Sequence, residues 1–318
     1  MTDAVPVNEF RCAPWTLAQG VDPIGSTPRF DALLLVEWPL PWPKDVSAIE
    51  PLALAAADPR AMVMAVVPRT LDGDATRVVH HRRVGTHRFV GIDHLVPRAE
   101  VPALLERLLD DLDADHLDWP SAVGPAPTDV LVCGHGKRDA CCGRWGTLLQ
   151  VELDARLDDV RVWRCSHTGG HRFAPTAITV GDGRAWAYAD ADLLVGVLER
   201  SVPVTALHGH DRGNAALDLW GQAAERAVFE HLGWAWLDGN ITAVSTTVAP
   251  DGQGARVALA WQDGDSTHHR AEAEVVVTRD VPVLVCGEPP EHAKKSSLEV
   301  AVTSLRIDDA PLAPAARP

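Results

Sequence analysis

The sequence predicts a mixed α/β protein in which two similar blocks of strands and helices precede a smaller α+β part. Short apolar runs that alternate with amphipathic segments indicate the two blocks. The remainder of the chain instead has one long amphipathic segment, followed by runs of alternating hydrophobicity that Gly and Asp turns separate. These observations divide the chain into residues 1–124, 125–207 and 208–318.

The first block begins with a short apolar run that is typical of a buried strand and ends with an amphipathic helix. Prolines at positions 39, 41 and 43 exclude a regular element directly after the first strand. A hairpin is expected around Gly85. The expected strands cover 30–37, 61–67, 76–84 and 87–94, and the expected helices cover 45–57 and 100–112.

The second block repeats this order of elements. The pair Asp182-Gly183 is a strong signal for the turn of a hairpin. Both blocks therefore read strand–helix–strand–strand–strand–helix, which is a thioredoxin-like plan: a βαβ unit followed by a hairpin and a covering helix. The expected strands cover 129–133, 160–165, 176–180 and 184–188, and the expected helices cover 139–157 and 191–200.

The C-terminal part, residues 208–318, is predicted to contain a helix and an antiparallel meander. The tail over 310–318 is rich in Pro and Ala, so we expect it to be disordered. The expected helix covers 215–232, and the expected strands cover 241–248, 256–261 and 271–278.

Charge and composition narrow the classes of function. The formal net charge of the 318 residues is −15, which would repel a phosphate backbone, so we expect no binding to nucleic acid. The same charge suits a basic partner protein, or serves solubility alone. No run approaches the roughly 18 apolar residues that a membrane span needs, and residues 1–11 lack a signal-peptide core. We expect a cytoplasmic protein without membrane contact.

Six cysteines in a chain of this length do not make a disulfide scaffold, and in a reducing compartment they indicate metal ligands or redox groups. Two Cys/His segments each lie where an expected strand gives way to a loop. They are V-C-G-H-G-K-R-D-A-C-C-G, residues 132–143, and R-C-S-H-T-G-G-H-R-F-A-P-T, residues 164–176. Because the ends of parallel strands in a βαβ unit face the same sheet edge, the two segments should meet in space.

The second segment predicts a tight turn rather than a helix. Gly169 and Gly170 are unfavourable inside a helix, so His167 and His171 bracket a Gly-Gly turn that can bring both imidazoles round one ion. From the residues alone, the prediction is a metal or redox site on a thioredoxin-like block.

Two interpretations of this site stay open at this level. Cys133, His135, Cys165 and His167 would make a tetrahedral Cys₂His₂ zinc site in a structural or regulatory protein. Cys133 and Cys142 would make the disulfide of a thioredoxin-like thiol redox protein.

Together these residues resemble the sucrase/ferredoxin-like family, a branch of the thioredoxin-like ferredoxins. The shared pattern is a cysteine, a histidine two residues on, an Arg-Asp pair, a second cysteine followed by glycine, and H-x-G-G-H downstream. The opening stretch over 11–45 also resembles that of the family, so the resemblance covers most of the chain. The matching residues are Cys133, His135, Arg138, Asp139, Cys142, Gly143, His167, Gly169, Gly170 and His171.

The resemblance implies a [2Fe–2S] cluster with bis-histidinyl, non-Rieske ligation. The implied ligands are Cys133 and Cys142 on one iron and His167 and His171 on the other, with the family spacing selecting Cys142 over Cys141. The implied function is one-electron transfer, with proton coupling through the histidines and an unidentified redox partner protein. We expect a redox carrier rather than a hydrolase, and no sucrase activity.

Other signals are weaker. Pro175 stands where thioredoxin-like folds keep a cis-proline, and we expect one here. Arg138 and Asp139 are expected to form an ion pair or a helix cap. The cysteines far from the cluster segment are expected to be free buried thiols, and the two histidine pairs are expected at the surface. These residues are Cys12, Cys286, His80, His81, His268 and His269.

Overall fold

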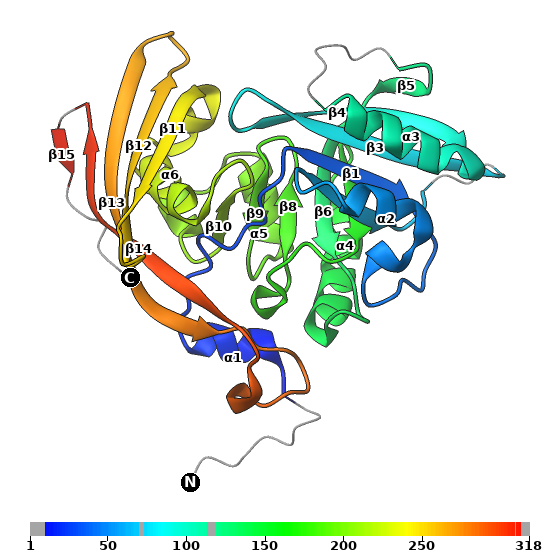
Figure 1. Ribbon diagram of the computed structural model, residues 1–318, viewed down its shortest axis with the longest axis horizontal. Coiled ribbons are helices and arrows are strands. Elements are labelled where there is room, and N and C mark those ends of the chain that lie inside the picture. Colours follow the sequence, from blue (N-terminus) through cyan, green and yellow to red (C-terminus); the bar gives the residue numbers. More distant parts are fainter. Residues whose placement is uncertain (1–9, 70–72, 113–118, 309, 313–318) are drawn as a thin grey trace.

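The computed structural model describes residues 10–69, 73–112, 119–308 and 310–312. A ten-stranded mixed sheet and a five-stranded antiparallel sheet form the two sides of the molecule (Figure 1). The protein is therefore mixed α/β, as the sequence predicts. Among the described residues, no helix has the length and apolar character needed to cross a membrane.

The first half of the ten-stranded sheet has the strand order β2-β1-β3-β4. Strands β1 and β2 are parallel, and β3 and β4 continue the sheet as an antiparallel hairpin. All six residues of β1 are buried because side chains cover both faces of the sheet. The bounds are β1 (Ala32–Glu37), α2 (Glu50–Ala56), β2 (Ala61–Val66), β3 (Ala75–Val84), β4 (Arg88–Pro97) and α3 (Val101–Asp110).

The second half repeats this arrangement, with the order β7-β6-β8-β9. Strands β6 and β7 are parallel, and β8 and β9 are antiparallel. The halves join through β2 and β7, where Val66 pairs with Cys165. Strands β5 and β10 flank the sheet. The bounds are β5 (Ala122–Pro125), β6 (Thr128–Cys133), α4 (Thr147–Arg156), β7 (Val160–Cys165), β8 (Ala177–Thr179), β9 (Arg184–Trp186), α5 (Ala191–Leu198) and β10 (Asp211–Asn214).

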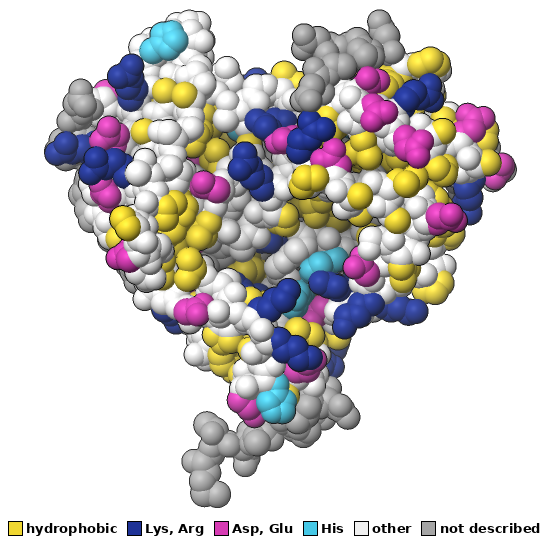
Figure 2. All heavy atoms as spheres, in the orientation of Figure 1, with side chains coloured by type: hydrophobic (Ala, Val, Ile, Leu, Met, Phe, Trp, Pro, Cys, Tyr) yellow, Lys and Arg dark blue, Asp and Glu magenta, His cyan; other side chains and the backbone are white. Residues whose placement is uncertain are grey.

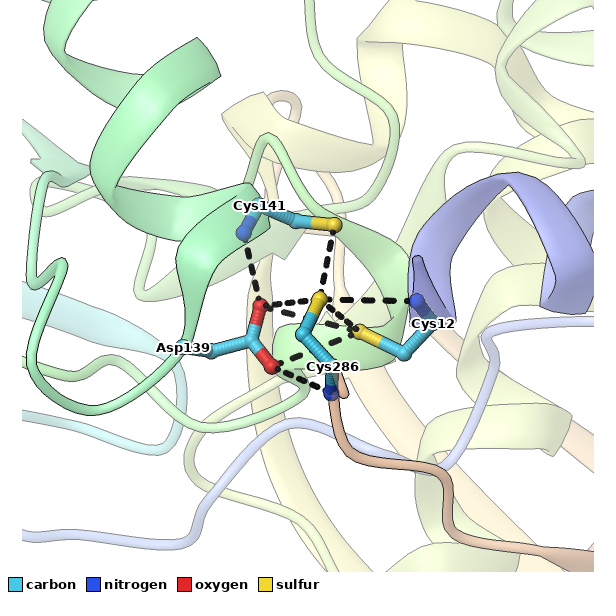
Figure 3. Close-up of side chains that lie close together, drawn as sticks. All are labelled: Cys12, Asp139, Cys141 and Cys286. Atoms are coloured by element: carbon cyan, nitrogen blue, oxygen red, sulfur yellow. Dashed lines mark hydrogen bonds between the residues drawn. The ribbon is translucent and has the colours of Figure 1, made fainter. Parts of the chain in front are cut away.

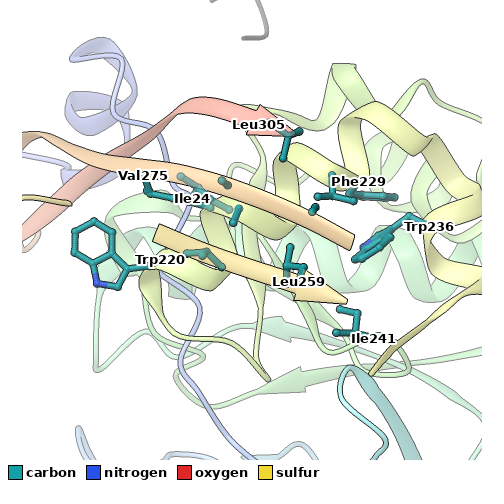
Figure 4. Close-up of a cluster of buried hydrophobic side chains, with 14 of the residues drawn as sticks. Ile24, Trp220, Phe229, Trp236, Ile241, Leu259, Val275 and Leu305 are labelled. Carbon is teal, nitrogen blue, oxygen red and sulfur yellow. The ribbon is translucent and has the colours of Figure 1, made fainter. Parts of the chain in front are cut away.

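The five-stranded sheet packs against helix α6. Apolar side chains of both elements, among them Phe229 and Leu259, form a continuous core together with Trp236 from the turn after α6 (Figure 4). The sheet runs in chain order and every strand pair is antiparallel. The bounds are α6 (Leu219–Leu232), β11 (Asn240–Val248), β12 (Gly254–Gln262), β13 (His268–Pro282), β14 (Ser296–Ile307) and β15 (Ala310–Leu312).

The tail prediction is wrong for residues 310–312, because they form β15 and pair with β14. Residues 313–318 lie outside the described residues. The short helix α1 (Cys12–Ala18) lies beside the connection between β13 and β14, at the foot of the molecule in Figure 1. The N–H of Gly287 in this connection donates to the carbonyl oxygen of Phe10, which ties the two segments together.

The prediction of surface positions is wrong for His80 and His81. Both side chains are buried, because β3 lies inside the sheet between β1 and β4. His81 Nε2 lies 2.9 Å from a carboxylate oxygen of Asp129. His268 is exposed as predicted, and His269 is half-buried.

Candidate metal centre

The two Cys/His segments leave the ten-stranded sheet side by side. Strand β6 ends at Cys133 and the parallel strand β7 ends at Cys165, and these two residues are register partners. The N–H of Gly134 donates to the carbonyl oxygen of Cys165 at 3.0 Å, which keeps the two chain segments together where they leave the sheet. The predicted meeting of the two segments is therefore confirmed.

Glycines let the first segment fold tightly over the end of β6. A Cβ atom on Gly143 would lie 2.3 Å from Cα of Gly136, and one on Gly146 would lie 1.9 Å from the carbonyl oxygen of Cys133. The segment then enters α4 through a π-helical turn over Cys142–Gly146. This close approach places the Cys142 side chain against the end of β6.

Three of the four predicted ligands lie in one group. One ligand atom each from Cys133, Cys142 and His167 lies within 4.8 Å of the other two. Sγ of Cys133 is 3.9 Å from Nδ1 of His167. Both cysteines are fully buried and His167 is half-buried, so a bound group would have thiolates on its inner side and an imidazole toward solvent.

The fourth predicted ligand, His171, stands beside this group. Gly169 and Gly170 have φ values of +79° and +65°, a conformation that favours glycine, and they turn the chain so that the two imidazole centroids are 5.5 Å apart. Two imidazoles on one tetrahedral ion, with metal–nitrogen bonds of about 2 Å, would hold their centroids roughly 5 Å apart. The spacing of His167 and His171 fits that arrangement.

The hydrogen bond of His171 decides which of its nitrogens is available. Nε2 lies 2.7 Å from the carbonyl oxygen of Leu284. A carbonyl oxygen only accepts, so Nε2 carries the hydrogen and the lone pair is on Nδ1. A metal-bound histidine commonly donates its second N–H in this way.

The pKa shifts of Cys133 and His171 also suit metal ligands. A hydrogen bond with Cys142, aided by His167, holds the pKa of Cys133 well below its usual range. The same bond with Cys133, together with burial, raises the pKa of Cys142. Burial lowers the pKa of His171 to about 4 and keeps its imidazole neutral. Thiolates and neutral imidazoles are the donors that an iron–sulfur centre with mixed ligation requires. Cys133 and His171 already have these states, and the binding of such a group would displace the proton of Cys142, so the residue types fit.

Cys165 and His135, the other two residues of the alternative Cys₂His₂ zinc site, do not join this group. Cys165 is fully buried, and burial raises its pKa, which is typical of an inert core thiol. His135 Nε2 lies 2.9 Å from the carbonyl oxygen of Pro43. Neither belongs to the group around Cys133 within the described part of the chain.

The peptide bond before Pro175 is cis, as predicted.

A second group of side chains was not predicted from the sequence. Cys12 is free and buried, as expected, whereas Cys286 is free but only half-buried. Both contact Asp139 and lie beside Cys141 (Figure 3). Asp139 accepts from the N–H of Cys141, as a cap would, and the described residues show no ion pair between it and Arg138. Burial, with Cys286 nearby, raises the pKa of Asp139 to about 6.

Comparison with known proteins places the chain in a family. The Sucrase/ferredoxin-like family matches residues 23–213. A protein of Meyerozyma guilliermondii described as "Altered inheritance of mitochondria protein 32" is 42% identical over 55 residues, which are 15% of this chain and 20% of that protein. The match thus spans about a fifth of that relative, and no solved structure matches. Since the family match covers more than half of the sequence and all four predicted ligands, the chain belongs to the Sucrase/ferredoxin-like family.

Proposed function

We propose that the protein is an electron carrier with a [2Fe–2S] cluster, held by Cys133 and Cys142 on one iron and by His167 and His171 on the other. The observation that carries this proposal is the convergence of two buried thiols and two imidazoles at the ends of β6 and β7. Such a group, when bound, accepts and returns one electron at a time. We propose a carrier rather than a hydrolase.

We also infer a thioredoxin-like fold for both halves of the ten-stranded sheet. Each half has a parallel βαβ unit followed by an antiparallel hairpin, and in each half the hairpin lies beside the first strand of that unit. Helices α3 and α5 follow the hairpins in the chain. These features support the inference, and they put the ligand loops at the end of the βαβ unit.

Proton coupling is assigned to His167 rather than to His171. The hydrogen on Nε2 of His171 is held by the Leu284 carbonyl oxygen. His167 turns Nδ1 toward Cys133 and its ring is only half-buried, so we propose Nε2 of His167 as the nitrogen through which a proton is coupled to the electron. An imidazole with one nitrogen toward the ligand group and the other toward water suits proton-coupled electron transfer.

The charges of the exposed side chains in the ligand segment indicate which kind of redox partner would dock there. The chain is acidic overall, but Lys137 and Arg144 in the ligand segment are exposed. In Figure 2, Lys and Arg side chains gather near a histidine in the lower middle of the face shown. We therefore propose a partner with an acidic docking face, rather than the basic partner that net charge alone suits. Cytoplasmic location and lack of nucleic-acid binding stay predictions.

The experiment that tests the function is anaerobic purification of the full chain, followed by iron and sulfide analysis. We expect a red-brown protein with about two irons and two sulfides per chain, as [2Fe–2S] requires. A colourless protein that stays colourless after reconstitution with iron and sulfide, and that binds zinc through Cys133 and His167, would contradict the proposal.

A pH titration of the reduction potential tests the proton coupling. We expect the potential to fall by up to about 59 mV per pH unit between roughly pH 6 and 9, because the reduced state holds the proton more tightly. The variant His167→Cys should lose this slope, and His171→Cys should keep it. A potential that is independent of pH in the unmodified protein would refute the coupling.

A further inference from the structure

A second group of metal-ligand side chains lies beside the proposed cluster site and comes from three distant segments. The Cys₃Asp group consists of Cys12, Asp139, Cys141 and Cys286, whose ligand atoms all lie within 4.8 Å of one another (Figure 3). Sγ of Cys286 is 3.5 Å from Sγ of Cys12, 3.1 Å from Sγ of Cys141 and 3.2 Å from Oδ1 of Asp139. Cys286 therefore stands in the middle of the group.

The Cys₃Asp group is buried, and its carboxylate is not paired with a cation among the described residues. Cys12, Cys141 and Asp139 are at most 3% exposed, and Cys286 is half-buried. No ion pair of the described residues includes Asp139, although buried carboxylates are normally paired with a cation or bound to a metal. A divalent cation among the three sulfurs would supply the missing charge.

We propose that the Cys₃Asp group binds one structural Zn²⁺ ion with tetrahedral geometry. Zinc–sulfur bonds of about 2.3 Å hold the sulfurs of a tetrahedral site roughly 3.8 Å apart. The sulfur separations of 3.1 and 3.5 Å need only a small outward movement to reach that value, whereas a cluster of several irons would need more room. Three protein thiols and one carboxylate fill all four positions, which is typical of a structural rather than a catalytic zinc site.

Main-chain N–H groups already orient the ligands. The N–H groups of Cys141 and Cys286 donate to the two oxygens of Asp139, at 2.9 and 3.2 Å. The N–H of Cys12 donates to Sγ of Cys286 at 3.5 Å. Contacts of this kind fix ligand orientation and offset the negative charge of thiolates around zinc. Zinc binding then releases to solvent the protons that the ligand thiols still carry.

The Cys₃Asp group connects the outer segments of the chain to the proposed cluster site. Cys141 directly precedes the ligand Cys142, and Cys286 follows Leu284, whose carbonyl oxygen holds His171, by two residues. Sγ of Cys12 also donates to the carbonyl oxygen of His171 at 3.7 Å. Zinc at this position would fasten α1 and the connection between β13 and β14 to the ligand loops.

Metal analysis of the full chain, expressed with zinc in the medium, tests the proposal. We expect one zinc per chain in addition to the iron. Cys286→Ala should lose the zinc, whereas Cys165→Ala, which removes a buried thiol outside both groups, should keep it. A Cys133→Ala/His167→Ala variant, which removes two ligands of the proposed iron–sulfur cluster, should also keep its zinc. This variant therefore tests the zinc site independently of the cluster.

Cobalt substitution gives a second measurement, which can also be made on the unmodified chain. The Co²⁺-loaded Cys133→Ala/His167→Ala chain and the Co²⁺-loaded unmodified chain should both show thiolate-to-cobalt charge transfer and tetrahedral ligand-field bands. Three results would each overturn the proposal: a reduced, folded unmodified chain that takes up neither zinc nor cobalt, a Cys286→Ala variant that keeps a full complement of zinc, or a disulfide among the three cysteines in the purified chain without metal.

Discussion

Nε2 of His171 lies 2.7 Å from the carbonyl oxygen of Leu284, in the connection between β13 and β14. A connection between two strands of the five-stranded sheet therefore supplies a contact that orients a side chain of the candidate metal centre. The family match ends at residue 213, so this contact comes from a part of the chain that lies beyond the matched region. A centre built on β6 and β7 thus depends on the C-terminal sheet for the orientation of one of its four proposed ligands.

Replacing His171 with cysteine tests its role as a ligand. We expect the His171→Cys variant to keep a cluster, with a reduction potential lower by on the order of 100 mV, because a thiolate carries more negative charge than a neutral imidazole. Protein-film voltammetry and visible spectroscopy measure the two effects. His268→Cys, at an exposed position on β13, is the matched control and should leave both unchanged. If the spectrum and potential of His171→Cys equal those of the unmodified protein, His171 is not a ligand.

Local spacing in the sequence was enough to predict how three of the proposed ligands meet. Cys133 ends one of two adjacent parallel strands, His167 follows the end of the other, and Cys142 lies in the segment that leaves β6. A βαβ unit brings such strand ends together whatever surrounds it. The Leu284 contact and the Cys₃Asp group could not be predicted in this way. His171 and Leu284 are 113 residues apart, and Cys12 and Cys286 are 274 residues apart, so only the packing of the two sheets brings them together.

The fold, too, could be predicted only where it depends on local features of the sequence. The element order of both blocks follows from apolar periodicity, which is a local property. The burial of His80 and His81 depends instead on the position of β3 inside the sheet, which is set by pairing between distant segments. Strand β14 was missed although its stretch L-E-V-A-V alternates, and the short β15 exists through its pairing with β14.

Gly146→Ala tests the close approach that places Cys142. A Cβ atom at this position would lie 1.9 Å from the carbonyl oxygen of Cys133, so the π-helical turn must move away from β6. We expect a loss of about 1–3 kcal/mol in the free energy of unfolding, which is usual for overpacking, together with reduced cluster content. Urea unfolding and iron analysis measure these effects.

The control for this substitution is Gly209→Ala, because a Cβ atom at that exposed glycine would meet no atom within 4 Å. Normal iron content in Gly146→Ala, with stability equal to that of Gly209→Ala, would show that the turn tolerates displacement.

Arg184→Met tests the buried ion pairs where the ten-stranded sheet meets α6. The Arg184 side chain is fully buried and pairs with Asp211 on β10 and Glu225 on α6. Its loss would leave two buried carboxylates without their cation, so we expect a loss of about 3–5 kcal/mol in the free energy of unfolding. Urea unfolding of the apo-protein measures this without any contribution from a bound group.

Arg256→Met is the matched control, because the pair between Arg256 and Glu274 is exposed and should contribute no measurable stability. Equal stabilities of the two variants would mean that the carboxylates around Arg184 take up protons or water at little cost.

His80→Leu tests a pH dependence that originates in the first half of the large sheet. Burial lowers the pKa of His80 to about 3, with smaller contributions from His94 and His81. Neither ring nitrogen of His80 has a hydrogen-bond partner among the described residues. Below pH 6.5 the unfolded chain binds a proton at His80 that the folded chain does not. Protonation of His80 therefore does not lower the free energy of unfolding above pH 6.5, and that free energy decreases as the pH falls from 6.5 toward 3.

We expect the free energy of unfolding of the unmodified protein to fall by about 1.4 kcal/mol more per pH unit below pH 6 than that of His80→Leu. At pH 8, His80→Leu should be at least as stable as the unmodified protein, since it removes two buried polar atoms that lack partners in the described part of the chain. Urea unfolding at pH 5, 6 and 8 measures both effects. His268→Leu, at the exposed position, should keep the slope of the unmodified protein. If the free energy of unfolding has the same pH slope in His80→Leu and in the unmodified chain, His80 is protonated in the folded state over the same pH range as in the unfolded state.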